Sequence, residues 1–203
     1  IIIKKLKEEK KLLGEDTLKH SYPHSWRSKA PLVYRATPQW FISMESQSLR
    51  NKAIKSINET KFYPSKGKDR LLSMIEGRPD WCVSRQRVWG VPLPIFISKK
   101  DGKVLIDDDV FENIAQIYEK EGSDCWFSDD PQRFLRQKYK AGDYEKLSDI
   151  VEVWFDSGST HSFVLEKRED LKWPASMYLE GSDQHRGWFH SSLLESCGTR
   201  DRA

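Results

Sequence analysis

The stretch Tyr178-Leu-Glu-Gly-Ser-Asp-Gln-His-Arg-Gly-Trp-Phe-His190 joins a short apolar run to a group of ionisable and amide side chains. Residues 177–179 are predicted to pack as a buried strand, and Gly181 lets the backbone approach a ligand closely because it carries no side chain. Residues 183–186 place hydrogen-bond donors and acceptors directly after this strand, where open α/β sheets bind their ligands. The stretch therefore predicts a ligand site at the end of a strand in an α/β fold.

Three further stretches are distinctive: Tyr34-Arg-Ala-Thr-Pro-Gln-Trp-Phe-Ile42, Arg78-Pro-Asp-Trp-Cys-Val-Ser-Arg-Gln-Arg-Val-Trp-Gly-Val-Pro-Leu-Pro94 and Val153-Trp-Phe-Asp-Ser-Gly-Ser159. Together with the first stretch they resemble the isoleucyl-tRNA synthetases, in that family's order. The match covers about residues 22–198. Valyl and leucyl synthetases are similar in this region, but D-Q-H-R-G-W-F and V-W-F-D-S-G-S are typical of the isoleucyl branch.

The resemblance implies part of a class I synthetase nucleotide-binding (Rossmann-like) core, α/β in class, with inserted mixed α+β segments. Residues 1–45 are then expected to be the C-terminal end of the editing insertion, and residues 46–95 to return into the catalytic core. The pattern of turn and helix signals changes after Ile95, which indicates a smaller α+β insertion over residues 96–149. Residues 150–203 would again belong to the catalytic fold.

Hydrophobic periodicity and capping residues predict the secondary structure along the chain. Helices are expected over residues 1–13, 49–57, 71–77, 81–87, 107–121 and 187–196, with another starting at residues 129–131. Strands are expected over residues 39–44, 150–155 and 177–181, and turns at residues 99–103 and 157–159. We also expect turn and strand between residues 20 and 38.

Trp154 and Trp188 each stand beside glycine and polar residues rather than inside an apolar run. A tryptophan is most often a large core residue, and that reading stays open for both. The resemblance implies instead that they are walls of the isoleucine side-chain pocket. Such a pocket separates isoleucine from valine by only about 1–3 kcal/mol, which explains why the family has a second, editing site. Asp156 and Ser157 follow Trp154, either as capping residues or as support for this pocket.

Glu180, Gly181, Asp183 and Gln184 form the most polar part of the first stretch. They are either a strand end with its turn and cap, or acceptors for ribose hydroxyls and an α-ammonium group. The resemblance implies that they bind the isoleucyl-adenylate. We assign His185 no role in proton transfer, because adenylate formation needs positioning and charge neutralisation rather than proton transfer.

Arg85, Arg87 and Trp89 combine cationic donors with an aromatic face, as residues that contact tRNA or phosphate do. Docking of the insertion on the core is the structural alternative. The first 70 residues carry 16 Lys and Arg against 7 Asp and Glu, so they are the better candidate for a phosphate backbone. A terminal helix with a solvated basic face would give the same composition.

The composition of the 203 residues, 37% hydrophobic and 32% charged, excludes a disordered chain, and no apolar run reaches the roughly 20 residues of a membrane helix. Three widely spaced cysteines indicate a reducing compartment, so we expect a cytoplasmic location and no membrane association. Some family members carry a zinc-binding C-x-x-C pair where this chain has Ser25 and Ser28, and serine hydroxyls are poor zinc ligands. No zinc is therefore predicted.

The resemblance implies an isoleucine–tRNA ligase that uses ATP with Mg²⁺, has isoleucine and tRNA(Ile) as partners, and is a monomer. The chain has no initial methionine and no sequence like H-I-G-H or K-M-S-K-S, the family's ATP-binding signatures. We therefore expect an internal piece that is inactive by itself, with no catalytic residue assigned in it. The alternatives are a freestanding RNA-binding module derived from such an enzyme, and a valyl or leucyl relative.

Overall fold

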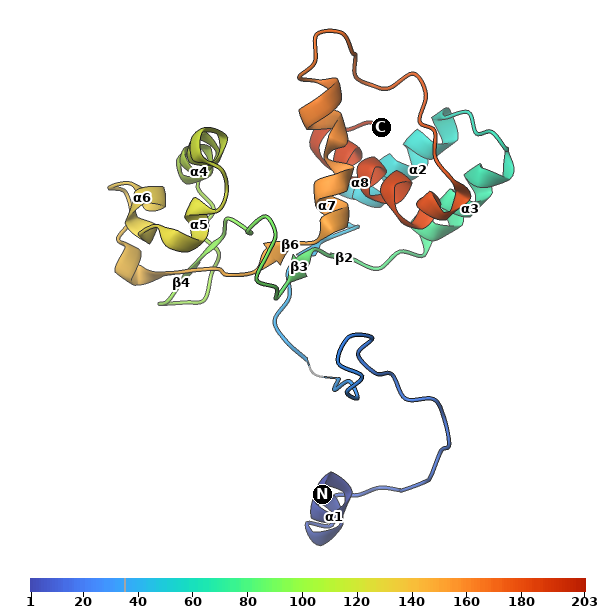
Figure 1. Cartoon of the computed structure of the whole chain (residues 1–203), viewed down its shortest axis with the longest axis vertical. Helices are drawn as coiled ribbons and strands as arrows, with labels where there is room; N and C mark the ends of the chain where they lie inside the picture. Colours follow the sequence, from blue (N-terminus) through green and yellow to red (C-terminus); the bar gives the residue numbers. More distant parts are fainter. Residues whose placement is uncertain (35) are drawn as a thin grey trace. The chain divides into compact units, whose positions relative to one another are not determined.

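The computed structural model describes residues 1–34 and 36–203, which form two compact units, residues 1–38 and 39–203 (Figure 1). In the first unit, helix α1 (Ile2–Glu8) ends before the predicted residue 13. None of its residues is buried, and a short helix without a packed face gains too little to extend. A loop follows, with one antiparallel bridge between His24 and Pro31 and a hydrogen bond from the Tyr22 hydroxyl to the Leu32 carbonyl, 2.7 Å.

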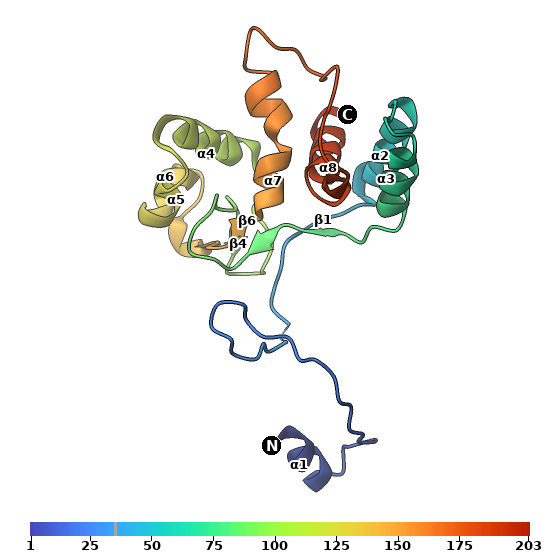
Figure 2. The same ribbon diagram turned by 45° about the vertical axis from the view of Figure 1, so that its right-hand side comes forward.

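The main core of the second unit is formed by three helices and a short sheet: α2 (Leu49–Glu59), α3 (Lys66–Glu76), α8 (Trp188–Arg200), β1 (Phe41–Ile42) and β2 (Trp81–Cys82) (Figure 2). The strands pair antiparallel, with Phe41 opposite Cys82. Helix α2 buries residues spaced by four, seven and eight positions, which is one face of a helix. Helices α2 and α8 confirm the prediction, and α3 begins five residues earlier than expected.

A second, separate core lies in the segment that follows. Helices α4 (Asp108–Glu121), α5 (Cys125–Ser128) and α6 (Pro131–Leu135) pack with the antiparallel pair β4 (Phe96–Ser98) and β5 (Tyr144–Lys146). Its centre is aromatic, with the Trp126 ring 4.9 Å from that of Phe134 and 5.1 Å from that of Phe96. This group of elements is called the insertion core below.

Local signals decide where the helices of the insertion core begin. The Asp107 carboxylate accepts hydrogen bonds from two backbone N–H groups of the first turn of α4. The Asp130 carboxylate accepts one, from Gln132, at the start of α6, where Pro131 is the first helical residue. Both starts confirm the prediction. The turn at residues 99–103 is also confirmed, since the Ser98 N–H donates to the Lys103 carbonyl and Gly102 has a φ of +69°.

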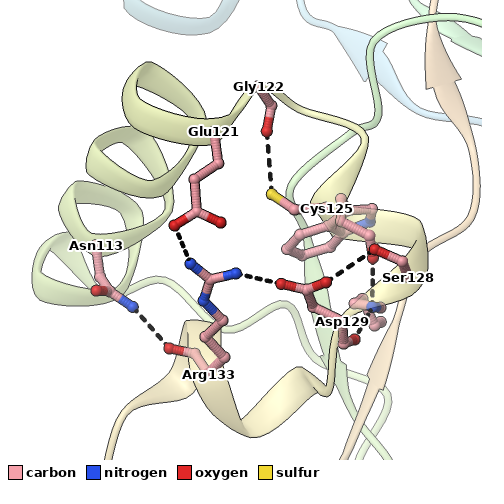
Figure 3. A network of polar contacts seen from close by, with 9 residues as sticks. Asn113, Glu121, Gly122, Cys125, Ser128, Asp129 and Arg133 are labelled. Carbon is pink, nitrogen blue, oxygen red and sulfur yellow. Dashed lines mark hydrogen bonds and ion pairs between the residues drawn. The ribbon is translucent and has the colours of Figure 1, made fainter.

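A network of polar contacts joins the helices of the insertion core (Figure 3). The Arg133 guanidinium pairs with the carboxylates of Glu121 and Asp129, from the ends of two different helical segments. Asn113, buried on α4, donates to the Arg133 and Phe134 carbonyls at 3.0 and 2.8 Å. Helix α6 is therefore held against α4 both through the Arg133 side chain and through the backbone carbonyls of Arg133 and Phe134.

The chain returns from the insertion core through β6 (Ile150–Val151), which pairs antiparallel with β3 (Ser84–Arg85). Helix α7 (Val153–Gly158) follows at once and lies beside α8 (Figures 1 and 2). The strand predicted over residues 150–155 is therefore wrong beyond Val151. The turn expected at residues 157–159 is the C-terminal end of α7.

Two other predicted elements are corrected. The helix expected over residues 81–87 is replaced by β2 and β3, because Trp81 and Cys82 pair with β1 while Ser84 and Arg85 pair with β6. The strand expected over residues 177–181 has no regular structure. Among the described residues no strand pairs with it, and an unpaired segment has no ladder of hydrogen bonds to hold it extended.

The described residues thus form helices and three two-stranded antiparallel sheets, with no parallel pair among them. This agrees with the broad α/β class. The parallel sheet of a Rossmann-like core is not among these elements.

Candidate functional site

Trp188 is the first residue of α8 and is held from three directions. Its backbone N–H donates to Gln184 Oε1 at 3.0 Å, and its indole Nε1 donates to the Ser157 carbonyl at 3.0 Å. The Tyr178 ring stacks on the indole with the ring centroids 4.2 Å apart and the planes at 20°. Three contacts therefore determine the orientation of the indole: one with the turn that precedes α8, one with α7 and one with the loop that contains Tyr178.

Trp154 lies on α7 and reaches the same end of α8. A Cβ atom placed on Gly187 would be 2.8 Å from Trp154 Cη2 and 3.1 Å from its Cζ3, so the outer edge of the indole rests on the backbone just before Trp188. The Trp154 side chain stays 39% exposed. The structure therefore brings the two predicted pocket tryptophans to one place, and neither is a fully buried core residue.

The four predicted adenylate-binding residues lie next to the tryptophans. Residues Ser182–Arg186 form a 3-10 turn, called η4, that leads into α8. Glu180, Gly181 and Asp183 are exposed, and the Asp183 carboxylate lies over Gly181, where a Cβ would be 2.6 Å from its Oδ1. Gln184 connects the two groups, because its Nε2 donates to Asp183 Oδ2 at 3.1 Å while its Oε1 accepts from Trp188.

His185 points away from these acceptors. Its Nδ1 is 2.7 Å from the Ser182 carbonyl, its ring meets the Phe189 ring edge-on at 5.4 Å, and its Nε2 would be 3.0 Å from a Cβ on Gly67 of α3. The residue is buried. His185 therefore anchors the η4 turn to α3.

The structure separates the three predicted nucleic-acid or phosphate contacts. Arg85 donates to Glu152 Oε2 at 2.9 Å and to the Ser84 and Cys82 carbonyls at 2.7 and 3.1 Å. Its guanidinium is thus engaged inside the fold, by partners that all lie outside the expected insertion over residues 96–149. Arg87 and Trp89 lie in the exposed segment that follows, where the Trp89 side chain is 90% exposed.

Two buried ionisable residues of α8, His190 and Glu195, were missed from the sequence. Burial, together with the charges of Asp156 and Glu152, raises the pKa of Glu195 to about 8. Burial and the positive charges of Arg78 and Arg186 lower the pKa of His190 to about 4. Among the described residues, Glu195 Oε1 and His190 Nε2 have no hydrogen-bond partner. The available signal was a single carboxylate, Glu195, in the otherwise uncharged stretch from Ser191 to Gly198.

Two further properties concern metals and membranes. In the part of the chain that the structure describes, no three His, Cys, Asp or Glu side chains are grouped so that they could hold a metal ion. Ser25 Oγ accepts the Ser28 N–H at 3.3 Å and Ser28 Oγ accepts the Ala30 N–H at 3.4 Å, so both serines close a turn. No helix in the described residues has both the length and the apolar character needed to cross a membrane.

Comparisons with known proteins cover the whole region of these sites. The "Isoleucine--tRNA ligase" of Pelagibacter ubique is 78% identical over 203 residues, which are 100% of this chain and 22% of that protein. The proteins of the same name from Brucella abortus and Zymomonas mobilis are 56% and 52% identical, over 100% and 98% of this chain and 21% and 22% of their own lengths. The chain therefore spans about a fifth of the length of these relatives.

The sequence model of the family described as tRNA synthetases class I (I, L, M and V) matches residues 5–203. Together with the relatives, this confirms the resemblance drawn from the four sequence stretches. The chain belongs to the class I tRNA synthetase family of the isoleucine, leucine, methionine and valine enzymes.

Proposed function

We propose that this chain is part of an isoleucine–tRNA ligase, which activates isoleucine with ATP to isoleucyl-adenylate and transfers it to tRNA(Ile) in the cytoplasm. The observation that carries the proposal is the meeting of two indoles with an acidic and amide group at the N-terminal end of α8. The printed names of the relatives support isoleucine as the amino acid. The alternative of a freestanding RNA-binding module is not favoured at 78% identity to a ligase.

The two tryptophans suit a branched aliphatic side chain. The one polar atom of the Trp188 indole is occupied by the Ser157 carbonyl, so the face that Tyr178 does not cover offers apolar area without a free donor. Trp154 is partly exposed and keeps surface for a ligand. Ser157 would therefore be the pocket support that its position after Trp154 suggested.

The polar group would bind the adenylate end of the same ligand. Asp183 and Glu180 are exposed carboxylates that can accept hydrogen bonds from ribose hydroxyls or an α-ammonium group, and Gly181 allows close approach. Both ends of the Gln184 amide are engaged within the protein. Gln184 would thus keep Asp183 at a set distance from the Trp188 wall, which aligns the two ends of one bound molecule.

In the proposed first step, the isoleucine carboxylate attacks the α-phosphate of ATP and pyrophosphate leaves. The contribution of this chain would be to position the amino acid and the nucleoside. No metal-holding group of three residues occurs among the described side chains, so we assign the chain no ligand for the accompanying Mg²⁺. The chain alone is expected not to catalyse the exchange of pyrophosphate into ATP.

The proposed domain boundaries follow from the same family. The separate insertion core, which runs from Phe96 in β4 to Lys146 in β5, supports an insertion over residues 96–149. Residues 1–45 would end the editing insertion, and residues 46–95 and 150–203 would belong to the catalytic part. Of the predicted RNA contacts, Arg87 and Trp89 remain proposed contacts for tRNA, since Arg85 is engaged with Glu152.

The test uses the full-length Pelagibacter ubique ligase with its matching segment replaced by this chain, assayed by isoleucine-dependent ATP–pyrophosphate exchange. Trp188→Ala should raise the isoleucine KM by an amount equivalent to about 2–4 kcal/mol, with little change in the ATP KM, because an apolar wall is lost. Asp183→Ala should instead lower the rate of adenylate formation, because a polar contact is lost.

Trp26→Ala, which removes an exposed tryptophan of the first unit, is the matched control and should change neither constant. A chimera without exchange activity would contradict the proposed function. Equal loss of ATP and isoleucine binding in Trp188→Ala would contradict the assignment of the pocket.

A further inference from the structure

Gly187 occupies a crowded position between the η4 turn and α8. A Cβ atom there would lie 2.7 Å from Gln184 Oε1 and 2.8 Å from Trp154 Cη2, both closer than real Cβ contacts. The residue is buried, and the residue that follows it is the pocket wall Trp188. A glycine here therefore provides the space in which the Trp154 indole lies.

We propose that Gly187 is a specificity-determining residue for the amino-acid side chain. Its missing side chain lets the edge of Trp154 rest directly on the backbone that leads into Trp188, and this contact sets the separation of the two indole walls. The inference rests on the proposed function, because it concerns the pocket of that function. A methyl group at this position displaces Trp154 from Trp188.

The effect of such a methyl group falls on the pocket more than on the fold. The crowded atoms are the outer ends of two side chains, and the 39% exposed Trp154 has room to turn away. Helix α8 itself is held by Leu193, Leu194 and Cys197 in the main core. Gly158 is different, since a Cβ there would be 2.9 Å from the Ser191 carbonyl carbon, which is backbone and cannot turn away.

The separation of the walls matters because isoleucine and its competitor valine differ by a single methylene group. One methylene in an apolar pocket is worth about 10–200-fold in selection, and only when the walls contact it. A displaced Trp154 loses that contact. The consequence is weaker isoleucine binding and a smaller preference for isoleucine over valine.

The test is Gly187→Ala in the same full-length chimeric ligase. The isoleucine KM should rise about 10-fold or more, the preference for isoleucine over valine in kcat/KM should fall, and the ATP KM should stay within about twofold. Gly198→Ala is the matched control on the same helix, because its Cβ would meet only Leu49 Cδ1 at 3.7 Å, and both KM values should be unchanged.

A double-mutant cycle assigns the effect to the indole edge. Trp154→Phe removes the indole atoms that crowd residue 187 and leaves Gln184 Oε1 in place, so Gly187→Ala should raise the isoleucine KM less in that background than beside Trp154. Unfolding of Gly187→Ala that is relieved in the double variant supports the same contact. The inference is overturned by an isoleucine KM within about twofold of the unsubstituted chimera, by an equal rise in the ATP KM, or by the same effect in both backgrounds.

If the unsubstituted chimera has no isoleucine-dependent exchange, the proposed function itself fails, and with it this inference. If the chimera is active and Gly187→Ala behaves like Gly198→Ala, only the inference fails.

Discussion

The insertion core and the candidate site differ in what they do with their apolar side chains. In the insertion core, Trp126, Phe134 and Leu135 are fully buried among residues of the same segment. Around the candidate site, Met177 and Leu179 are 78% and 81% exposed, while polar residues such as His190 and Glu195 are buried on α8. The insertion core buries its own apolar side chains, while the candidate site leaves apolar surface exposed and buries ionisable groups.

The difference is the one expected between a region that stabilises the fold and the proposed binding site. A closed aromatic cluster contributes to folding through burial, and the charged groups around Arg133 are paired as in Figure 3, while the buried Tyr118 hydroxyl has no partner among the described residues. The site region keeps Glu195 and His190 with buried atoms that lack partners among the described residues, which costs stability. Such arrangements are typical of sites where function rather than packing decides the residue.

The sharpest test of the closed core is Phe134→Ala in the chain. Removing a fully buried ring should lower the free energy of unfolding of the insertion core by about 3–5 kcal/mol, because a cavity replaces the contacts with Trp126. Urea unfolding followed by tryptophan fluorescence measures this. Phe127→Ala, which removes a phenylalanine that is 44% exposed, is the control with a small effect. Equal effects of the two would break the comparison.

The buried carboxyl of the site region should make stability depend on pH. The raised pKa of Glu195, about 8 in the folded chain, means that the folded state retains a proton that the unfolded state releases near its ordinary value of 4.5. Stability should therefore fall as pH rises towards 8. The lowered pKa of His190 works in the opposite direction, mainly from about pH 4 to 6.5, so it offsets only a small part of the fall between pH 6.5 and 8.

We expect a loss of about 1–2 kcal/mol between pH 6.5 and 8, measured by urea unfolding at each pH. Glu195→Gln should remove most of this slope, because the amide has no proton to release. Glu166→Gln on the exposed pair with Arg200 is the control and should keep the slope. A Glu195→Gln profile that matches the unsubstituted chain would show that the carboxyl is not the titrating group.

The smallest expected effect concerns the exposed segment next to the site. Arg87→Ala in the chimeric ligase should weaken tRNA binding by about 1 kcal/mol or less and reduce the salt dependence by about one unit, as the loss of one phosphate contact does. Arg85→Ala should act mainly on stability, because its guanidinium pairs with the buried Glu152. If Arg85→Ala changes the salt dependence and Arg87→Ala does not, their roles are reversed.

The sequence was sufficient wherever one segment carries its own signal. Asp107 and Pro131 mark helix starts through groups only a few residues away, and the spacing of apolar residues in 49–57 defines one helix face. The family could also be recognised, because the order of residues in the four stretches can be compared without knowing how they pack. These features depend on neighbours in the chain.

Tertiary structure decided whatever depends on distant segments. A strand needs a partner, so residues 81–85 became strands beside β1 and β6, while residues 177–181 found none among the described residues. The engagement of Arg85 with Glu152 and the raised pKa of Glu195 arise from burial between segments far apart in sequence. Neither electrostatics nor strand pairing can be predicted from a residue and its neighbours, because both are set by what the fold brings within a few ångströms.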